Sequence, residues 1–494
     1  MRETLRTRMG WLHAWTGFVG GLVMVCVFVT GSLSVFDTEI TRWMQPEVRV
    51  APGTPLTPAA LDVAARMIHE GETHGIPAFL ALPSPRSPTL KVLHYDGREF
   101  TGPQLDPQTG VIIPARQTAG GEFFFRFHYT LCMQGPAGIL AVDIPAIGLL
   151  VAIGSGLVIH IRALLPDIVL LRLSATRLRA WLDAHLLTGV LFLPFMVMIT
   201  YTGVLVHVDR LLPAIPVTSL WSQGRPVSRS TAIRPPHVAP SPVFQPLPPL
   251  APLLAAARAP LGGREAGFIL FSPDHLSIFA SDASGPFLTR DHADFHLPDG
   301  ALLATAATSG SIARSVQLLH GLHYARFAAT GLRWLYLVSG LCATAVIASG
   351  LVLFGMKRRR DRGHTVAFRI GEGLTMTTLV GLPASLCALL WASRLLPATL
   401  PGRDGTEITV FFTVWGLCAL HALTCAVTGR GLRAWRTQLA MSAVLAGGLL
   451  PLDGLTAPAA LHAAPAIHAA VDGMGLGAAS LALYVLSHLR DRAA

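Results

Sequence analysis

A histidine-containing pattern occurs twice in this chain. The positions shared by the two copies, all in the same register, are His13, Thr16, Gly17, Thr30, Gly31 and Asp37 in the first copy and His185, Thr188, Gly189, Thr202, Gly203 and Asp209 in the second. Both copies lie in apolar stretches that are long enough to cross a bilayer as a helix. A histidine in such a stretch costs free energy unless a partner holds it. Two histidines in equivalent places therefore suggest a shared task, and ligation of haem iron is the first candidate.

A second pair of histidines extends the duplication. The tripeptides Phe127-His128-Tyr129 and Leu322-His323-Tyr324 each lead into another apolar stretch, and these stretches contain the related strings Ser155-Gly156-Leu157-Val158 and Ser349-Gly350-Leu351-Val352. The core is therefore expected to be two copies of a helix, an extramembrane segment and a second helix. Internally duplicated membrane proteins commonly carry functional groups where their halves meet.

This arrangement predicts two histidines near each face of the membrane. The pairs are His13 with His185 and His128 with His323, and Gly17 and Gly189 lie one turn after the first pair. Binding of haem b requires two imidazoles from facing helices, an apolar slot, and small residues that let the macrocycle approach the backbone. The neighbouring Thr16 and Thr188 could fix the orientation of the imidazoles or bond the preceding turn of backbone.

Other readings of the histidines remain open. A single histidine at a membrane boundary is more often an interfacial anchor than a ligand, although four in repeat-related positions are harder to explain in this way. His320 lies three residues before His323, on the same face if the segment is helical, and is a substitute for the outer ligand. His207, at the end of the third apolar stretch, is a second substitute, and His160 is a third.

The composition indicates a membrane protein. Of 494 residues, 52% are hydrophobic and only 13% are charged, against about 25% charged in a typical soluble domain. The net charge of +10 comes from basic residues that cluster beside apolar stretches, so it does not indicate binding to nucleic acid. The six cysteines form no Cys-x-x-Cys pair, which argues against a disulfide framework or a thiolate zinc site.

Eight apolar segments approach the roughly 20 residues that cross a bilayer as a helix. They are residues 11–36, 137–160, 181–207, 332–356, 374–396, 408–428, 437–452 and 466–488. Arginine and lysine gather before the first span, after the second, fourth and sixth, and after the last. Because basic loops stay in the cytoplasm, we expect an even number of spans and both termini on the cytoplasmic side.

Two long segments then lie outside the membrane. In the first, a helix over Pro58–Glu70, capped by Thr54 or Thr57, and strands over Ala78–Leu82, Thr89–Tyr95 and Gly110–Ile113 are expected, with a turn at Asp96-Gly97. The second opens with a Pro-rich stretch, Arg234–Pro252, which is not expected to form regular structure. A helix over Leu250–Arg258 and strands near Gly267–Phe271 and Leu276–Ala280 follow, so this segment looks like a degenerate copy of the first.

The expected fold class is a mainly α, polytopic membrane protein with a duplicated four-helix core and two small extracytoplasmic α+β modules. Its parts in chain order are helix 1 (1–36), the first module (37–136), helices 2 and 3 (137–207), the second module with its Pro-rich start (208–331), helix 4 with a basic loop (332–362), and a C-terminal extension of about four helices (363–494).

In these residues the chain resembles the PepSY-associated transmembrane family, which includes bacterial iron-regulated inner-membrane proteins and ferric-siderophore reductases. The matching pieces are Leu12-His13 to Thr30-Gly31 with Trp43, then Phe127-His128, then Asp183-x-His185 to Thr202-Gly203, and finally Leu322-His323 to Ser349-Gly350-Leu351 with the basic cluster Lys357–Arg360. The segment ending Leu105-Asp106-Pro107-Gln108-Thr109-Gly110 looks like a PepSY module. The resemblance covers about residues 8–362 and leaves the C-terminal extension unexplained.

The resemblance implies a protein of the bacterial inner membrane that holds two b-type haems and passes electrons outward to a periplasmic ferric siderophore or other ferric chelate. By position, His13 and His185 would bind the inner haem iron, and His128 and His323 the outer one. A separate electron donor, either a quinol or a cytoplasmic reductase, would be needed, because the chain shows no flavin or nicotinamide domain.

Two rival functions follow from the same sequence. One is a non-redox binding or regulatory protein, whose extramembrane modules bind a partner and whose histidines are structural. The other is a permease for a siderophore or another solute. Binding of haem by the purified protein distinguishes the first rival from the reductase, and uptake that does not depend on the histidines would favour the second.

Overall fold

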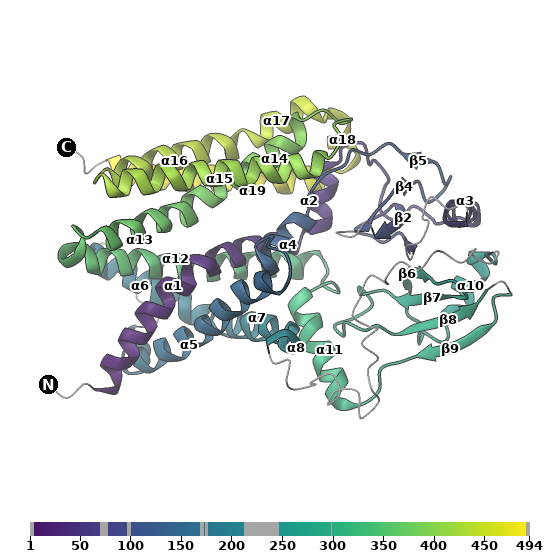
Figure 1. Ribbon diagram of the computed structural model, residues 1–494, viewed down its shortest axis with the longest axis horizontal. Coiled ribbons are helices and arrows are strands. Elements are labelled where there is room, and N and C mark those ends of the chain that lie inside the picture. Colours follow the sequence, from purple (N-terminus) through teal and green to yellow (C-terminus); the bar gives the residue numbers. More distant parts are fainter. Residues whose placement is uncertain are drawn as a thin grey trace. The chain divides into compact units, whose positions relative to one another are not determined.

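Figure 1 shows the chain as a computed structural model, which describes residues 4–69, 78–95, 100–167, 172, 176–211, 247–297 and 299–490. It divides into two compact units. The membrane unit contains residues 1–46, 116–211 and 330–494, and the sheet unit contains residues 47–115 and 212–329. Both long extramembrane segments therefore contribute to the sheet unit, whereas the apolar helices all belong to the membrane unit.

Seven helical segments in the described part of the chain are long and apolar enough to cross a membrane, and an eighth is bent. The straight segments are built from α1 (Leu5–Ser34), α5 (Pro136–Asp167), α12 (Thr330–Arg362), α13 (Val366–Met376) with the π-helix η2 (Thr377–Gly381) and α14 (Leu382–Leu395), α15 (Arg403–Val427), α16 (Gly431–Gly447) with α17 (Leu449–Thr456), and α19 (Pro465–Arg490). This agrees with the eight spans expected from the sequence. The protein is thus a mainly α, multi-pass membrane protein.

The bent span consists of α6 (Arg177–Leu191) and α7 (Leu193–Val206), which meet at an angle of 66°. Pro194 lies in the first turn of α7. A proline has no N–H to donate and its ring clashes with the carbonyl four residues earlier, so a continuous helix cannot form through this position. The equivalent residue of the first repeat copy is Leu22, and α1 is a single α-helix there.

Glycines allow α1 to pack closely against α5 and α12. A Cβ atom added at Gly21 would lie 3.2 Å from side-chain atoms of Ile347 and Leu351, and one added at Gly20 would lie 3.5 Å from the carbonyl oxygen of Pro145. Small residues serve this purpose at many membrane helix interfaces, where close approach of the backbones increases van der Waals contact. The first span therefore packs closely against two other helices of the four-helix core.

The sheet unit holds one antiparallel sheet to which both extramembrane segments contribute. Its strands are β1 (Phe79–Ala81), β2 (Leu90–Tyr95), β3 (Phe100–Thr101), β4 (Gln104–Leu105), β5 (Ile112–Ile113), β6 (Ala266–Phe271), β7 (His275–Ala280), β8 (His292–His296) and β9 (Leu302–Ala306). The order is β5-β4-β2-β1-β6-β7-β8-β9, with β3 paired to β2. β1 and β6 join the segments, with Phe79 opposite Leu270, so the two expected modules share one sheet.

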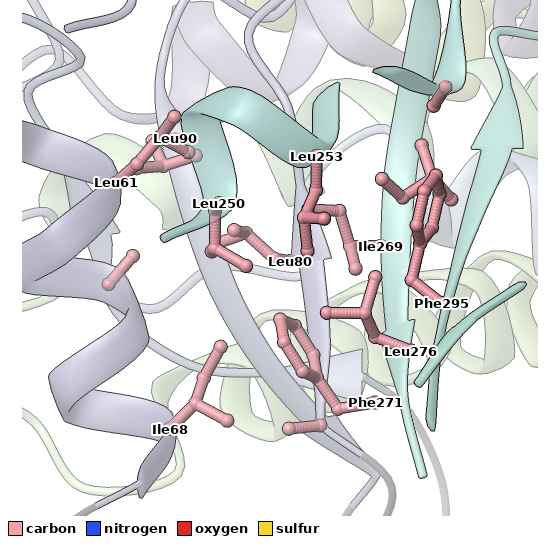
Figure 2. Packing of buried hydrophobic residues seen from close by; sticks show 14 of the residues in the cluster. Leu61, Ile68, Leu80, Leu90, Leu250, Leu253, Ile269, Phe271, Leu276 and Phe295 are labelled. Carbon is pink, nitrogen blue, oxygen red and sulfur yellow. The ribbon is translucent and has the colours of Figure 1, made fainter. Parts of the chain in front are cut away.

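Helices α3 (Pro58–His69) and α10 (Leu250–Ala257) supply the hydrophobic cover of this sheet. Figure 2 shows the core that results, in which Leu61 and Ile68 from α3 and Leu250 from α10 meet strand residues such as Leu80. All of these side chains are almost fully buried. Because alternate strand residues point to opposite faces, only one face of each strand contributes to this core.

Most elements expected in the extramembrane segments are present. Thr57 caps α3, since its hydroxyl accepts a hydrogen bond from the backbone N–H of Ala60 at 3.2 Å. The strands β1, β2, β5, β6 and β7 match expected strands, whereas β3, β4, β8 and β9 were not anticipated. The turn at Asp96-Gly97 lies outside the described residues, as does the Pro-rich stretch Arg234–Pro252 up to residue 246, and from Leu250 this stretch is already helical.

Candidate functional site

The imidazole rings of His13 on α1 and His185 on α6 face each other inside the membrane unit. Their ring centres are 6.2 Å apart and their planes are inclined by 74°. A metal–imidazole bond is about 2 Å long and each ligating nitrogen lies about 1.1 Å from its ring centre, so two imidazoles on opposite sides of one metal ion have ring centres about 6 Å apart. The observed separation of 6.2 Å is compatible with such an arrangement.

Each of these histidines uses its Nδ1 atom to bind the backbone of a neighbouring helix. The Nδ1 atom of His13 is 2.8 Å from the carbonyl oxygen of Ala152. The Nδ1 atom of His185 is 2.9 Å from the carbonyl oxygen of Val346 and 3.0 Å from the hydroxyl of Ser349. A carbonyl oxygen only accepts hydrogen bonds, so Nδ1 carries the proton and Nε2 keeps its lone pair. This is the state in which an imidazole binds a metal.

Two glycines make room for the imidazoles against the facing helices. A Cβ atom at Gly156 on α5 would lie 2.9 Å from the Cε1 atom of His13, and one at Gly350 on α12 would lie 3.3 Å from the Cε1 atom of His185. The two glycines are equivalent positions of the duplication. Each copy thus supplies one histidine together with the glycine that lets a histidine ring approach the backbone.

A cavity of about 420 Å³ lies beside the two rings. Its volume falls within the range of about 300–1,000 Å³ that is usual for small-molecule sites. His160, Gly17 and Gly189 contribute to its wall, which is mainly apolar. Three basic side chains also line it, namely Arg6, Lys357 and Arg358. A flat apolar ligand that carries acidic groups fits this combination of surfaces.

His128 forms a separate site further along α1. It lies on α4 (Glu122–Thr130), and its Nδ1 atom is 2.8 Å from the carbonyl oxygen of Val27. A Cβ atom at Gly31 would lie 2.4 Å from this nitrogen, so only glycine fits there. Val27 follows His13 by 14 residues on α1, which corresponds to about 21 Å at 1.5 Å per residue. The two histidine sites are therefore near opposite ends of the membrane span.

The family of the chain is shown by its match over this region. The family described as the PepSY-associated TM region matches residues 10–357. The chain belongs to the PepSY-associated TM family. The match includes both copies of the histidine pattern and runs from α1 to α12, whereas the C-terminal extension from α13 onward lies beyond it. No curated protein matches the chain.

In this PepSY-associated TM protein, α4 packs against the C-terminal extension. Phe123 and Phe127 of α4 contact Phe411 of α15, with ring centres 4.8 and 5.3 Å apart. The ring of Trp415 lies 5.7 Å from that of Phe127. These side chains belong to a buried cluster to which α14 also contributes. The extension therefore covers the aromatic face of the helix that carries His128.

A buried ion pair also binds the loop before α4 to the extension. The carboxylate of Glu407 accepts hydrogen bonds from the Thr118 hydroxyl at 2.7 Å and the Ala119 N–H at 2.8 Å. Arg403 pairs with Glu407 and donates to the carbonyl oxygen of Gln117 at 2.8 Å. Both charged side chains are fully buried. Because an unpaired charge could not remain there, this loop has little freedom to move.

The structure places the remaining candidate histidines as follows. His207 lies in the membrane unit, 3.2 Å from the carboxylate of Asp143, and its ring centre is 6.1 Å from that of Tyr129. His320 and His323 lie on α11 (Ser311–Tyr324), which belongs to the sheet unit. The pairing of His128 with His323 therefore stays a prediction, and His207 is the candidate partner within the same unit.

Thr16 and Thr188 bond the preceding turn of their own helices. The hydroxyl of Thr16 donates to the carbonyl oxygen of Leu12 at 2.7 Å, and that of Thr188 donates to the carbonyl oxygen of Ala184 at 2.6 Å. Of the two roles expected for these threonines, the backbone bond is the one observed. The sequence did not predict that Gly156 and Gly350 make room for the imidazoles, or that the carbonyl oxygens of Ala152 and Val346 accept their hydrogen bonds. Both glycines nevertheless lie in the repeated strings.

A site for a bare metal ion is not indicated. In the ranges that the structure describes, no group of three or more histidine, cysteine, aspartate and glutamate side chains is placed to hold one. The paired histidines fit a planar iron complex better, because a porphyrin supplies four ligands itself and needs only two from the protein.

The environment of His128 leads to a prediction about pH. Burial lowers the pKa of His128 below its ordinary value of 6.5. The unfolded chain takes up a proton near pH 6.5 that the folded protein does not, so stability is complete above that pH and falls as the pH drops below it. We expect the Tm of the detergent-solubilised protein to fall from pH 6.5 towards pH 5, with a smaller fall in His128→Gln. Equal falls in the two proteins would contradict this assignment.

Proposed function

We propose that this protein is a haem-containing electron conduit of the bacterial inner membrane that reduces ferric siderophores or other ferric chelates on the periplasmic side. The observation that carries the proposal is the geometry of His13 and His185, whose ring centres are 6.2 Å apart and whose Nδ1 atoms are both used by the backbone of neighbouring helices. Bound haem would supply one-electron chemistry, accepting electrons on one side of the membrane and giving them to Fe(III) on the other.

The residues around the inner pair suit haem b. His13 and His185 would be the axial ligands, and the basic side chains of Arg6, Lys357 and Arg358 would pair with the propionate carboxylates. Gly17 and Gly189 line the cavity, and a Cβ atom at Gly17 would meet no atom within 4 Å. The apolar remainder of the wall would exclude water from the macrocycle.

The outer haem would be held by His128 together with His323, with His207 and His320 as substitutes. Burial keeps His128 neutral, because it lowers the pKa of this side chain, and a neutral imidazole is the form that ligates iron. The Gly31 backbone and the Val27 carbonyl fix the position of the ring. The contacts of α4 with the C-terminal extension would then keep the ligand in place.

The distribution of charge supports the orientation on which the proposed direction of electron flow depends. The basic residues that line the inner cavity lie at the start of α1 (Arg6) and near the end of α12 (Lys357 and Arg358), and basic clusters beside membrane spans face the cytoplasm. Both termini would then be cytoplasmic, and the sheet unit would lie in the periplasm and position the ferric chelate. Reduction releases the iron because hard oxygen ligands hold Fe(II) much less strongly than Fe(III).

The test is an absorbance spectrum of the purified protein with and without dithionite. A Soret band that shifts and sharpens on reduction, together with a resolved α-band, is expected. If the protein is colourless after expression with ample haem, the electron-conduit proposal is wrong and the non-redox binding or regulatory function is favoured. Solute uptake that survives both His13→Ala and His128→Ala would instead favour a permease.

The space beside Gly17 gives a sharper prediction for the inner site. A leucine side chain there would extend into the cavity, so Gly17→Leu is expected to lose about half of the bound haem, one of two groups. Gly17→Ala should keep most of it. The measurement is the pyridine haemochrome content per protein. Gly148→Leu is a matched control, because a Cβ atom at Gly148 on α5 also meets nothing within 4 Å but lies outside the cavity wall.

A further inference from the structure

A large groove lies between helices of the four-helix core and helices of the C-terminal extension. Its volume is about 1130 Å³, and its walls come from α1, α6 and α12 on one side and from α13, α14, α16 and α19 on the other. The lining is mainly apolar and includes the indole side chains of Trp11, Trp15 and Trp181. A groove of this size within the membrane region can hold an aromatic ring together with part of a long hydrocarbon chain.

The groove and the inner haem cavity share a wall. Phe18, Phe354 and Arg358 line both spaces. The rings of Phe18 and Phe354 are stacked with centres 4.1 Å apart and planes only 7° from parallel, and the guanidinium of Arg358 lies 3.7 Å from the centre of the Phe354 ring. A ligand in the groove would therefore be separated from the haem cavity by a single layer of aromatic side chains.

Ser349 provides a second connection between the groove and the inner haem ligand. This serine lines the groove, and its hydroxyl is 3.0 Å from the Nδ1 atom of His185. Its hydroxyl also donates to the carbonyl oxygen of Val346 at 2.8 Å, which is the same carbonyl that His185 contacts. A wall residue of the groove, Ser349, therefore helps to orient His185, the proposed haem ligand.

Carboxylates that can accept protons lie at the arginine-rich end of the groove. Glu372 and Asp361 are among the lining residues. The side chain of Glu372 is 15% exposed and pairs with Arg359. Arg359 pairs with Glu372, the guanidinium of Arg358 lies over the Phe354 ring, and Arg362 also lines this end. The carboxylates of this end can accept hydrogen bonds from a hydroxyl-bearing head group.

We propose that this groove binds an isoprenoid quinol, which is the electron donor of the conduit; this inference rests on the proposed function. The two O–H bonds of the quinol break and its ring becomes a quinone. Its two electrons would leave one at a time, past Phe18 and Phe354, toward the His13–His185 site, where bound haem would accept each and pass it on, so that two Fe(III) of the chelate substrate become Fe(II). The two protons go to Glu372 and Asp361 and from there to cytoplasmic water.

Ubiquinone-2 binding to the full-length purified protein tests the site without relying on activity. An azido derivative is cross-linked by light, and the labelled peptides are mapped by mass spectrometry with and without excess ubiquinone-2. Labelling of α12, α13 or α19 peptides that ubiquinone-2 suppresses is expected. If phosphatidylglycerol suppresses the labelling as strongly as ubiquinone-2 does, the groove binds membrane lipid without selectivity, and the proposal is overturned.

Gly355→Phe is the variant that fills the groove. Gly355 lines it and a Cβ atom there would meet no atom within 4 Å, so the fold should tolerate the ring. We expect the Kd for ubiquinone-2 to rise at least tenfold, whereas Gly148→Phe on α5 should bind as the unmodified protein does. Unchanged binding in Gly355→Phe would overturn the assignment of the site.

Reduction by ubiquinol-2 separates the failure of this inference from the failure of the proposed function. If the protein holds haem and ubiquinol-2 reduces it as fast in Gly355→Phe as in the unmodified protein, the groove is not the donor site, and the proposed electron-transfer function is unaffected. If the protein holds no haem, the donor role fails together with the proposed function. Haem reduction that is at least tenfold slower in Gly355→Phe, with an unchanged haem content, supports both.

Discussion

Replacing His185 by alanine is expected to remove the inner haem and therefore about half of the bound haem, while the protein remains in the membrane. The reason is geometric. The ring of His185 lies 6.2 Å from that of His13, and α6 carries no other histidine that could replace it. The measurement is haem content per protein by pyridine haemochrome, with a redox titration that should lose one of two midpoint potentials.

His364→Ala is the matched control for this experiment, because His364 is exposed in the loop between α12 and α13. His13→Ala should repeat the loss seen with His185→Ala, and the double variant should lose no more than either single variant. Added imidazole should restore part of the lost absorbance in His185→Ala by filling the vacated position. Full haem content in His185→Ala would show that the inner pair is assigned wrongly.

Replacing Glu407 by alanine is expected to have the second largest effect, and it acts on the outer site. The change leaves the buried guanidinium of Arg403 without its carboxylate, and it removes the acceptor for Thr118 and Ala119. Breaking a buried ion pair in this way costs roughly 3–5 kcal/mol. Because these groups hold the loop before α4, we expect the outer haem to be lost or shifted in potential while the inner haem is retained.

Hydrogen–deuterium exchange of the 116–130 segment gives a readout that does not depend on haem. Exchange there should rise in Glu407→Ala, rise less in Glu407→Gln, which keeps an oxygen acceptor, and stay unchanged in Asp404→Asn, one turn earlier on α15. A variant that loses both haems equally would indicate general unfolding of the membrane unit, and this result would contradict a local role for the extension.

The equivalent histidines could be recognised from the sequence because an internal duplication repeats the same residue pattern, and this repeat can be found without knowing the fold. The pairing of His13 with His185 followed from their equivalent places, and the structure brings these rings together. Their acceptors, Ala152 and Val346, could not be predicted, because a backbone carbonyl is present at every residue. Gly156 and Gly350 carried a signal, since they recur in the repeated strings, but their use depends on helix rotation, which the sequence does not specify.

The fold beyond the spans was less accessible to sequence reasoning. Apolar length predicted the membrane helices, and turn residues with alternating patterns predicted several strands. The pairing of β1 with β6 joins residues almost two hundred positions apart, and no local pattern encodes such a partner. The role of the C-terminal extension was equally hidden, because Phe411 and Glu407 show their relation to α4 only through contacts in space.

The break at Pro194 makes the two halves of the duplicated core differ in the continuity of their first helix. In the first half, His13 and Gly31 lie on one continuous helix, α1, which connects the two ends of the span. In the second half, His185 lies before the 66° bend and Thr202 lies after it. α6 packs against α12 and α7 packs against α5, so the two parts of this bent span have different neighbours. The first repeat copy therefore crosses the core on one continuous helix, whereas the second crosses it on two shorter helices that meet at Pro194.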